Sequence, residues 1–139
     1  MSYDLTRFIK AQELNYQQAL EEIRSGKKQS HWIWYIFPQL KGLGKSEYSE
    51  YYGIENSYEA LEYIKNPYLN GHLREICEAL LNLDSLSVRE IMGRPDDIKL
   101  RSCMTLFAVV SEENQIFLDV LDRYFDGRKD GRTLRMLGL

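Results

Sequence analysis

Apolar residues recur at intervals of three and four along most of the chain, the spacing that places them on one face of an α-helix. Longer stripes of this kind predict helices over residues 4–25, 95–110 and 114–125, a helix that begins at Asn56 and a long one from Asn66 to Leu83. Shorter stripes predict helices over 31–37, from Ser46 through Tyr52, from Ser87 to Gly93, and over 132–137. We therefore expect an all-α fold, a compact array of seven to nine short helices that forms one domain over residues 1–139.

Capping residues mark where these helices begin. Asp4 can cap the first helix, and Asn15 offers a second cap, so we expect that helix to be broken near its middle. Further N-caps are expected at Ser30, Ser46, Asn56, Asn66 (before Pro67) and Ser87. The aromatic and β-branched run 31–37 is also compatible with a strand, but no partner strand is visible elsewhere, and helix is preferred.

Composition narrows the classes of function. A chain of 139 residues with 44% hydrophobic residues is long enough for one buried core. Its net charge of -3 argues against general nucleic-acid binding, which favours a basic excess. Cys77 and Cys103 lie far apart in apolar helical context, so no disulfide is expected. The two histidines have no helical spacing and there is no Cys-x-x-Cys, so neither a metal site nor a cofactor is expected. Without an apolar run of membrane-spanning length or a signal peptide, we expect a cytoplasmic protein.

The stretch 30–46 concentrates the residues that could form a site. It holds both tryptophans, one of two histidines, and a loop with Gly42 and Gly44. We predict that Trp32 or Trp34 stacks on a ring, and that His31, with Gln39, transfers a proton or orients a water. Lys45, Ser46 and the loop N–H groups would hold a phosphate. The alternative is a core position for at least one tryptophan. The sequence Gly-Leu-Gly-Lys-Ser lacks the first glycine and the strand of a phosphate-binding P-loop, so that reading is rejected.

A second candidate is the stretch 97–107, where polar side chains interrupt an apolar helix. Lys99, Ser102 and Thr105 lie on one side of it and are candidate ligand-binding residues. Alternatively, both hydroxyls bond the carbonyl group four residues earlier. Because both this stretch and 31–46 carry polar groups that need partners, we predict that the two pack together. A third candidate is the charged glycine loop 126–134, whose charges are expected to be solvated.

Three motifs carry a family resemblance. They are His-Trp-x-Trp-x-x-Phe-Pro-Gln-Leu-x-Gly-Leu-Gly-x-Ser at 31–46, Lys-x-Arg-Ser-x-Met-Thr-Leu-Phe at 99–107 and Phe-Asp-Gly-x-x-Asp-x-x-Thr-Leu at 125–134. With the Asp4-Leu-x-Arg-Phe start and Gln12, the chain resembles the bacterial domain of unknown function 1810 family. The resemblance implies a mostly helical single-domain protein and no established activity. Some members are labelled calpastatin, but calpastatin-type inhibitors are largely disordered, unlike a chain with 12% aromatic residues.

The first hypothesis is therefore binding or hydrolysis of a small anionic ligand, nucleotide-like or ADP-ribose-like, at the Trp/His/Gly-loop site. A similarity at the level of fold class to the YbiA-like N-glycosidases makes an N-glycosidic bond the reaction to name, although no catalytic residue is carried over. Two alternatives stay open: a non-catalytic module that docks a peptide or a nucleic-acid end, and a purely structural role for the motif.

Overall fold

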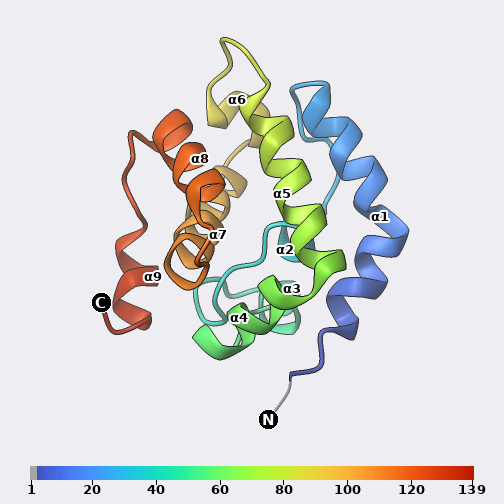
Figure 1. Cartoon of the computed structure of the whole chain (residues 1–139). Coiled ribbons are helices and arrows are strands. Elements are labelled where there is room, and N and C mark those ends of the chain that lie inside the picture. The colour runs from blue at the N-terminus through green and yellow to red at the C-terminus, as the bar shows by residue number, and fades with distance from the viewer. Residues whose placement is uncertain (1–2) are drawn as a thin grey trace.

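The computed structural model describes residues 3–139 and is built from helices (Figure 1). Over this range the chain forms nine helices and no strand, so the all-α prediction is confirmed. The helices are α1 (Thr6–Arg24), α2 (Ile33–Ile36), α3 (Glu47–Tyr51), α4 (Ser57–Lys65), α5 (Pro67–Leu81), α6 (Val88–Met92), α7 (Asp96–Val110), α8 (Gln115–Phe125) and α9 (Gly131–Met136).

Helix α7 lies at the centre of the packing. It contacts α2, α4, α6, α8 and α9, while α1 and α5 lie side by side on the other side of the molecule (Figure 1). Because neighbours cover α7 on several sides, the run Ser102–Ala108 is buried throughout, polar residues included. Polar side chains in such a helix must find hydrogen-bond partners within the protein.

Most predicted caps are present. Ser46, Asn56 and Asn66 each accept a hydrogen bond from a backbone N–H in the first turn of α3, α4 and α5. Ser87 and Glu90 form a reciprocal capping box at α6. These local signals set the helix starts correctly, as expected for groups that satisfy the orphan N–H donors of a first turn.

Two boundary predictions are wrong. Helix α1 runs unbroken through Asn15, whose side-chain amide donates to the carbonyl oxygen of Ala11 instead of capping. Ser30 does not cap the next helix, because its hydroxyl donates to Glu22 and α2 starts only at Ile33. In both cases the side chain expected to cap a helix is hydrogen-bonded to another group instead.

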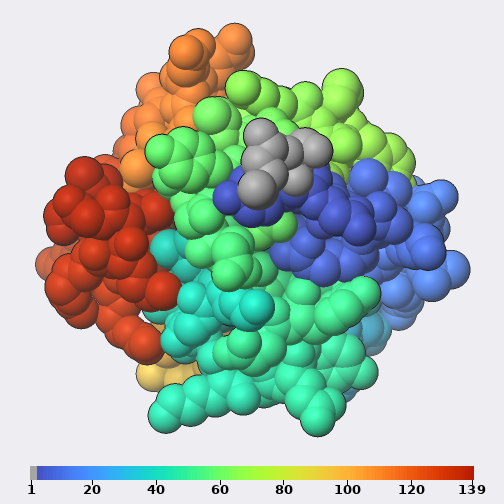
Figure 2. All heavy atoms as spheres, turned by 90° about the horizontal axis from the view of Figure 1, so that it is seen from below, coloured from blue at the N-terminus to red at the C-terminus, as the bar shows by residue number. Residues whose placement is uncertain are grey.

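The segment between α2 and α4 is held by close backbone approaches. Leu40 and Ile54 form an isolated parallel bridge, with the Lys41 N–H donating to the Ile54 carbonyl at 2.8 Å. A Cβ on Gly44 would lie 2.3 Å from the hydroxyl oxygen of Ser49, so a side chain there would displace α3. Figure 2 shows this segment, in cyan to green, between the start of α1 in blue and the C-terminal segment in red.

Neither cysteine is in a disulfide. Cys77 and Cys103 are free and fully buried, and burial raises the pKa of both thiols, which keeps them protonated. Within residues 3–139 no helix is both long and apolar enough to cross a membrane.

Candidate functional site

An open pocket of about 520 Å³ lies where α1, α2 and α3 meet. Helix α1 contributes Ala11, Leu14 and Asn15 to its wall, and α3 contributes Tyr48 and its C-cap residue Tyr52. From the 31–46 stretch, His31, Trp34 and Tyr35 line it. We call these eight residues the aromatic pocket. Its volume falls in the range of small-molecule sites.

Trp34 is the motif residue that bridges this pocket to α7. The Tyr48 ring stacks on the indole with ring centroids 4.7 Å apart and an angle of 24° between the planes. The ammonium group of Lys99 lies 5.3 Å from the centre of the same ring, within range of a cation–π contact. The 31–46 stretch therefore packs against the 97–107 helix, as predicted.

Tyrosine hydroxyls gather in the aromatic pocket. The Tyr35 and Tyr52 rings lie 5.2 Å apart. Burial raises the pKa of both phenols, and neighbouring phenols, among them Tyr48, raise it further. Both groups are therefore neutral O–H groups near pH 7, able to donate and to accept hydrogen bonds.

The two residues of the predicted acid–base pair line different pockets. His31 is exposed and lines the aromatic pocket, whereas Gln39 lines a space of only about 10 Å³ behind Trp34, with Ser49 and Gly53. The buried Nε1 of Trp34 has no hydrogen-bond partner within residues 3–139. Trp34 lines both spaces, whereas Gln39 is not among the residues that line the aromatic pocket. A joint catalytic role for His31 and Gln39 stays a prediction.

Lys45 and Ser46 lie outside the aromatic pocket. The Ser46 hydroxyl accepts from the Ser49 N–H at 3.1 Å and donates to the Ser49 hydroxyl, so it already serves as the cap of α3. The first turn of α3 carries Glu47 and Glu50, which complement the helix dipole and repel an anion. A phosphate-binding role for Lys45 and Ser46 stays a prediction.

Trp32 is a core residue. Only 1% of its surface is exposed, and its indole N–H donates to the Glu22 carboxylate at 2.8 Å. The Lys28 ammonium group lies 4.9 Å from the ring centre and pairs with Asp96 at 2.7 Å. The ammonium group of Lys99 lies 3.8 Å from the same carboxylate. Asp96 therefore pairs with both Lys28, which lies over Trp32, and Lys99, which lies over Trp34. The alternative of a core role thus holds for Trp32.

The hydroxyls of α7 follow the alternative reading given above. Ser102 donates to the carbonyl oxygen of Ile98, and Thr105 donates to that of Arg101, each four residues earlier. Thr105 also accepts the backbone N–H of Asp130 at 2.8 Å. Neither residue lines the aromatic pocket, and a ligand role for either stays a prediction.

Arg101 and Asp130 show what the second and third motifs do together. The Arg101 guanidinium donates to the carbonyl oxygens of Arg128 and Lys129, and Asp130 caps α9 through the Thr133 N–H. The side chains of Arg128 and Lys129 are exposed, in agreement with the prediction that the loop's charges are solvated. The backbone of the loop is nevertheless fixed to α7.

Sequence reasoning missed the part of the pocket wall that comes from α1 and α3. Tyr48 and Tyr52 were assigned only to a helix, although the density of tyrosines after the glycine loop was a usable signal. It also missed a buried network in which Gln12 donates to the Tyr35 carbonyl and the Tyr63 hydroxyl and bonds His72 at 2.9 Å. The hydrogen bond from Gln12 to its carbonyl oxygen fixes the backbone of Tyr35.

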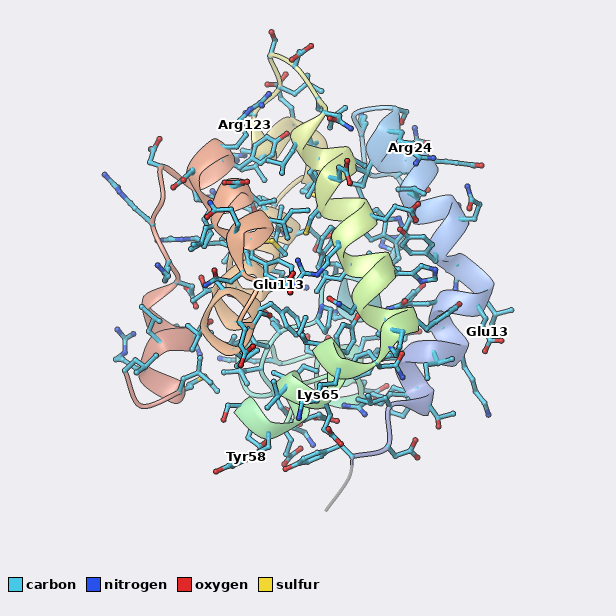
Figure 3. All side chains as sticks on the ribbon, in the orientation of Figure 1. Glu13, Arg24, Tyr58, Lys65, Glu113 and Arg123 are labelled. Atoms are coloured by element: carbon cyan, nitrogen blue, oxygen red, sulfur yellow. The ribbon has the colours of Figure 1, made fainter. Side chains whose placement is uncertain are left out.

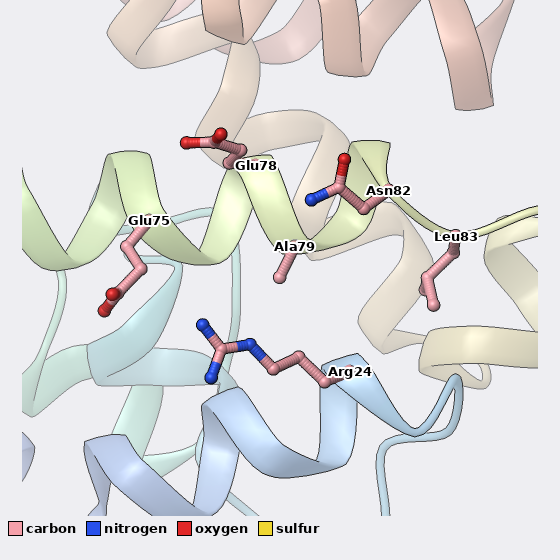
Figure 4. A pocket seen from close by; sticks show the side chains of 6 residues that line it. All are labelled: Arg24, Glu75, Glu78, Ala79, Asn82 and Leu83. Carbon is pink, nitrogen blue, oxygen red and sulfur yellow. The ribbon is translucent and has the colours of Figure 1, made fainter.

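A second hollow lies between the end of α1 and α5, where Arg24 lies on the same side of α5 as Glu75 (Figure 4). Glu78 and Asn82 also line it. Its charged side chains are exposed, and none contains a buried polar atom without a partner. Across residues 3–139 there is no group of three or more His, Cys, Asp or Glu side chains placed to hold a metal ion.

The family described as Protein of unknown function (DUF1810) matches residues 2–137. The chain belongs to this family. Its fold is also that of a solved structure, the conserved hypothetical protein Rv1873 from Mycobacterium tuberculosis, at 42% sequence identity and a TM-score of 0.96. The similarity covers 99% of this chain and 98% of that one. No curated protein has significant similarity to this DUF1810 chain.

Proposed function

We propose that this DUF1810 protein binds a nucleotide-like or ADP-ribose-like compound, with the nucleoside part in the aromatic pocket. The observation that carries the proposal is the convergence of Trp34, Tyr35, Tyr48 and Tyr52 on one open space with His31 at its edge. Stacking of a base on an aromatic side chain contributes about 1–3 kcal/mol. Phenol hydroxyls and the Asn15 amide supply donors and acceptors for a base edge or a ribose.

The charge of the wall limits the role of phosphate. No lysine, arginine, aspartate or glutamate lines the aromatic pocket. The ligand's phosphate groups would extend toward solvent and contribute little affinity, so a nucleoside should bind about as tightly as its nucleotide. This separates the proposal from a phosphate site at Lys45 and Ser46, which would bind only the nucleotide.

Binding is favoured over catalysis. His31 is the only histidine of the wall, and no carboxylate lines the pocket to orient it. Hydrolysis of an N-glycosidic bond would require His31 to act alone on a bound ligand. We therefore propose that His31 contacts the ligand without taking part in catalysis. Hydrolysis of ADP-ribose by the protein would instead support proton transfer by His31.

A second candidate, docking of a protein, is favoured by apolar exposure at the pocket's edge. Leu14 is 83% exposed and Tyr48 is 59% exposed, and both line the pocket. A flat partner surface would cover both side chains without entering the space between them.

The test is a thermal-shift titration with adenosine, AMP and ADP-ribose. A ligand at 100 times its dissociation constant should stabilise the protein by about 2.7 kcal/mol. We expect this gain with all three compounds, its loss in Tyr48→Ala, and its retention in Tyr58→Ala, a matched exposed tyrosine of α4 outside the pocket. If no compound raises the midpoint of the wild type, the proposal is wrong and protein docking becomes the better candidate.

A further inference from the structure

A second large pocket lies away from the aromatic pocket and shares no residue with it. It is a pocket of about 420 Å³ between the end of α4, the start of α5 and the connection from α7 to α8. Leu61 and Ile64 of α4 provide its apolar wall. Figure 3 labels Lys65 and Glu113, two of its charged residues. This inference is independent of the proposed function.

Arg74 is fixed in this pocket before any ligand arrives. Its Nε donates to the Asn70 side chain at 2.9 Å, and one terminal nitrogen donates to the Glu113 carbonyl at 2.6 Å. The guanidinium also lies 5.1 Å from the centre of the Phe117 ring. Its other terminal nitrogen has no partner within residues 3–139. An arginine held in this way loses little side-chain entropy when it binds a carboxylate.

Ser111 supplies a polar group that lacks a partner. Only 7% of the residue is exposed, it lines the pocket, and its hydroxyl is buried with no hydrogen bond to any described residue. A buried hydroxyl without a partner costs about 1–3 kcal/mol. Such groups are uncommon in folded proteins and are expected where a ligand completes the hydrogen bonding.

The charges of the wall are balanced. Lys65 and Arg74 are cationic, and Glu112 and Glu113 are anionic. A ligand with one charge can pair with only one of these two sets of side chains, whereas a zwitterion can pair with both. The apolar wall of Leu61 and Ile64 adds a preference for an aliphatic side chain.

We propose that this pocket binds a free α-amino acid with an aliphatic side chain, of the leucine type. Arg74 and Lys65 hold its carboxylate, Glu112 and Glu113 hold its ammonium group, and Leu61 and Ile64 cover its side chain. Ser111 donates its hydroxyl hydrogen to the ligand carboxylate. Each charged group of the ligand is thereby matched by groups that the pocket already presents.

The experiment is a titration of the whole chain with L-leucine, followed by backbone amide NMR shifts. Two analogues each lack one charge: 4-methylpentanoate has no ammonium group, and isoamylamine has no carboxylate. We expect shifts at residues 61–65 and 111–113 with L-leucine, and binding at least about tenfold weaker for each analogue, which corresponds to 1.4 kcal/mol. Equal binding of either analogue, or no shift with about 10 mM L-leucine, would overturn the proposal.

Three variants separate binding from folding. Ser111→Ala should leave the free protein as stable as wild type or more stable, because it removes the buried hydroxyl without a partner, and should still weaken leucine binding. Glu112→Gln changes an exposed side chain, so it should fold normally and weaken binding of leucine but not of 4-methylpentanoate. Arg24→Gln, in the separate hollow beside Glu75, is the matched control and should bind leucine as wild type does. Normal leucine binding by both Ser111→Ala and Glu112→Gln would also contradict the assignment.

Discussion

The carboxylate of Glu22 accepts the indole N–H of Trp32 at 2.8 Å, and this bond ties the motif's first tryptophan to α1. Burial by itself would raise the pKa of Glu22. Hydrogen bonds from the Ser30 hydroxyl, the Gln29 N–H, the Trp32 indole and the Ser30 N–H lower it instead, to about 2. One carboxylate therefore organises the whole turn from α1 into the motif.

The lowered pKa of Glu22 predicts a pH dependence of stability. Because the pKa is lower in the folded protein than the ordinary value of 4.5, the unfolded chain binds the proton more readily. The stabilisation is complete above about pH 5 and is lost as the pH falls toward 2. We expect Glu22→Gln to cost about 1–2 kcal/mol at pH 7, after allowing for solvent screening, and nothing at pH 2. Urea unfolding across this range measures it, with Glu21→Gln, an exposed neighbour on α1, as the control.

Replacing each tryptophan by phenylalanine should lower the free energy of unfolding by different amounts. Trp32→Phe removes part of a fully buried ring and the bond to Glu22, so we expect a loss of about 2–4 kcal/mol in the free energy of unfolding. Trp34 is half-buried and its N–H has no partner, so Trp34→Phe should cost about 1 kcal/mol or less. Chemical denaturation compares them directly. A larger loss for Trp34 would contradict the core assignment of Trp32.

His31 and Ser46 should both tolerate alanine. His31 is exposed, so His31→Ala should leave the thermal midpoint within about 2 °C of wild type. Ser46→Ala removes the cap of α3, which costs about 1 kcal/mol and lowers the midpoint by about 2–4 °C. Calorimetry measures both. Unfolding of either variant at room temperature would assign that residue a role in the core.

Ser102 and Thr105 of α7 both bond a carbonyl group four residues earlier, but only Thr105 also accepts a hydrogen bond from the loop. Thr105→Val leaves the Asp130 N–H without its acceptor, and we expect a loss of about 1–3 kcal/mol. Ser102→Ala removes only a bond to a carbonyl that already belongs to the helix, and should cost less than about 1 kcal/mol. Hydrogen exchange of the Asp130 and Thr133 amides should accelerate in Thr105→Val alone. Equal acceleration in both variants would show that the loop is not held through Thr105.

The sequence by itself determined the helices, because their signals are local. Apolar spacing and the caps at Ser46, Asn66 and Ser87 act within a few residues, and each helix start that depends on them is where the pattern predicts it. The motif 31–46 also lies at a pocket, since His31 and Trp34 line the aromatic pocket. Its packing against α7 was predicted, but the contact is made by the Lys99 ammonium group on the Trp34 ring. The Ser102 and Thr105 hydroxyls donate within their own helix and not to the motif.

Only the tertiary structure decided which motif residue does what. Trp32 is buried because Glu22, ten residues earlier, accepts its N–H, whereas Trp34, two residues later, faces the pocket. Asn15 and Ser30 do not cap helices, because their side chains donate hydrogen bonds to the Ala11 carbonyl oxygen and to the Glu22 carboxylate. The wall of the pocket comes from three helices, and the spacing of residues along one helix carries no information on what a neighbouring helix places opposite it.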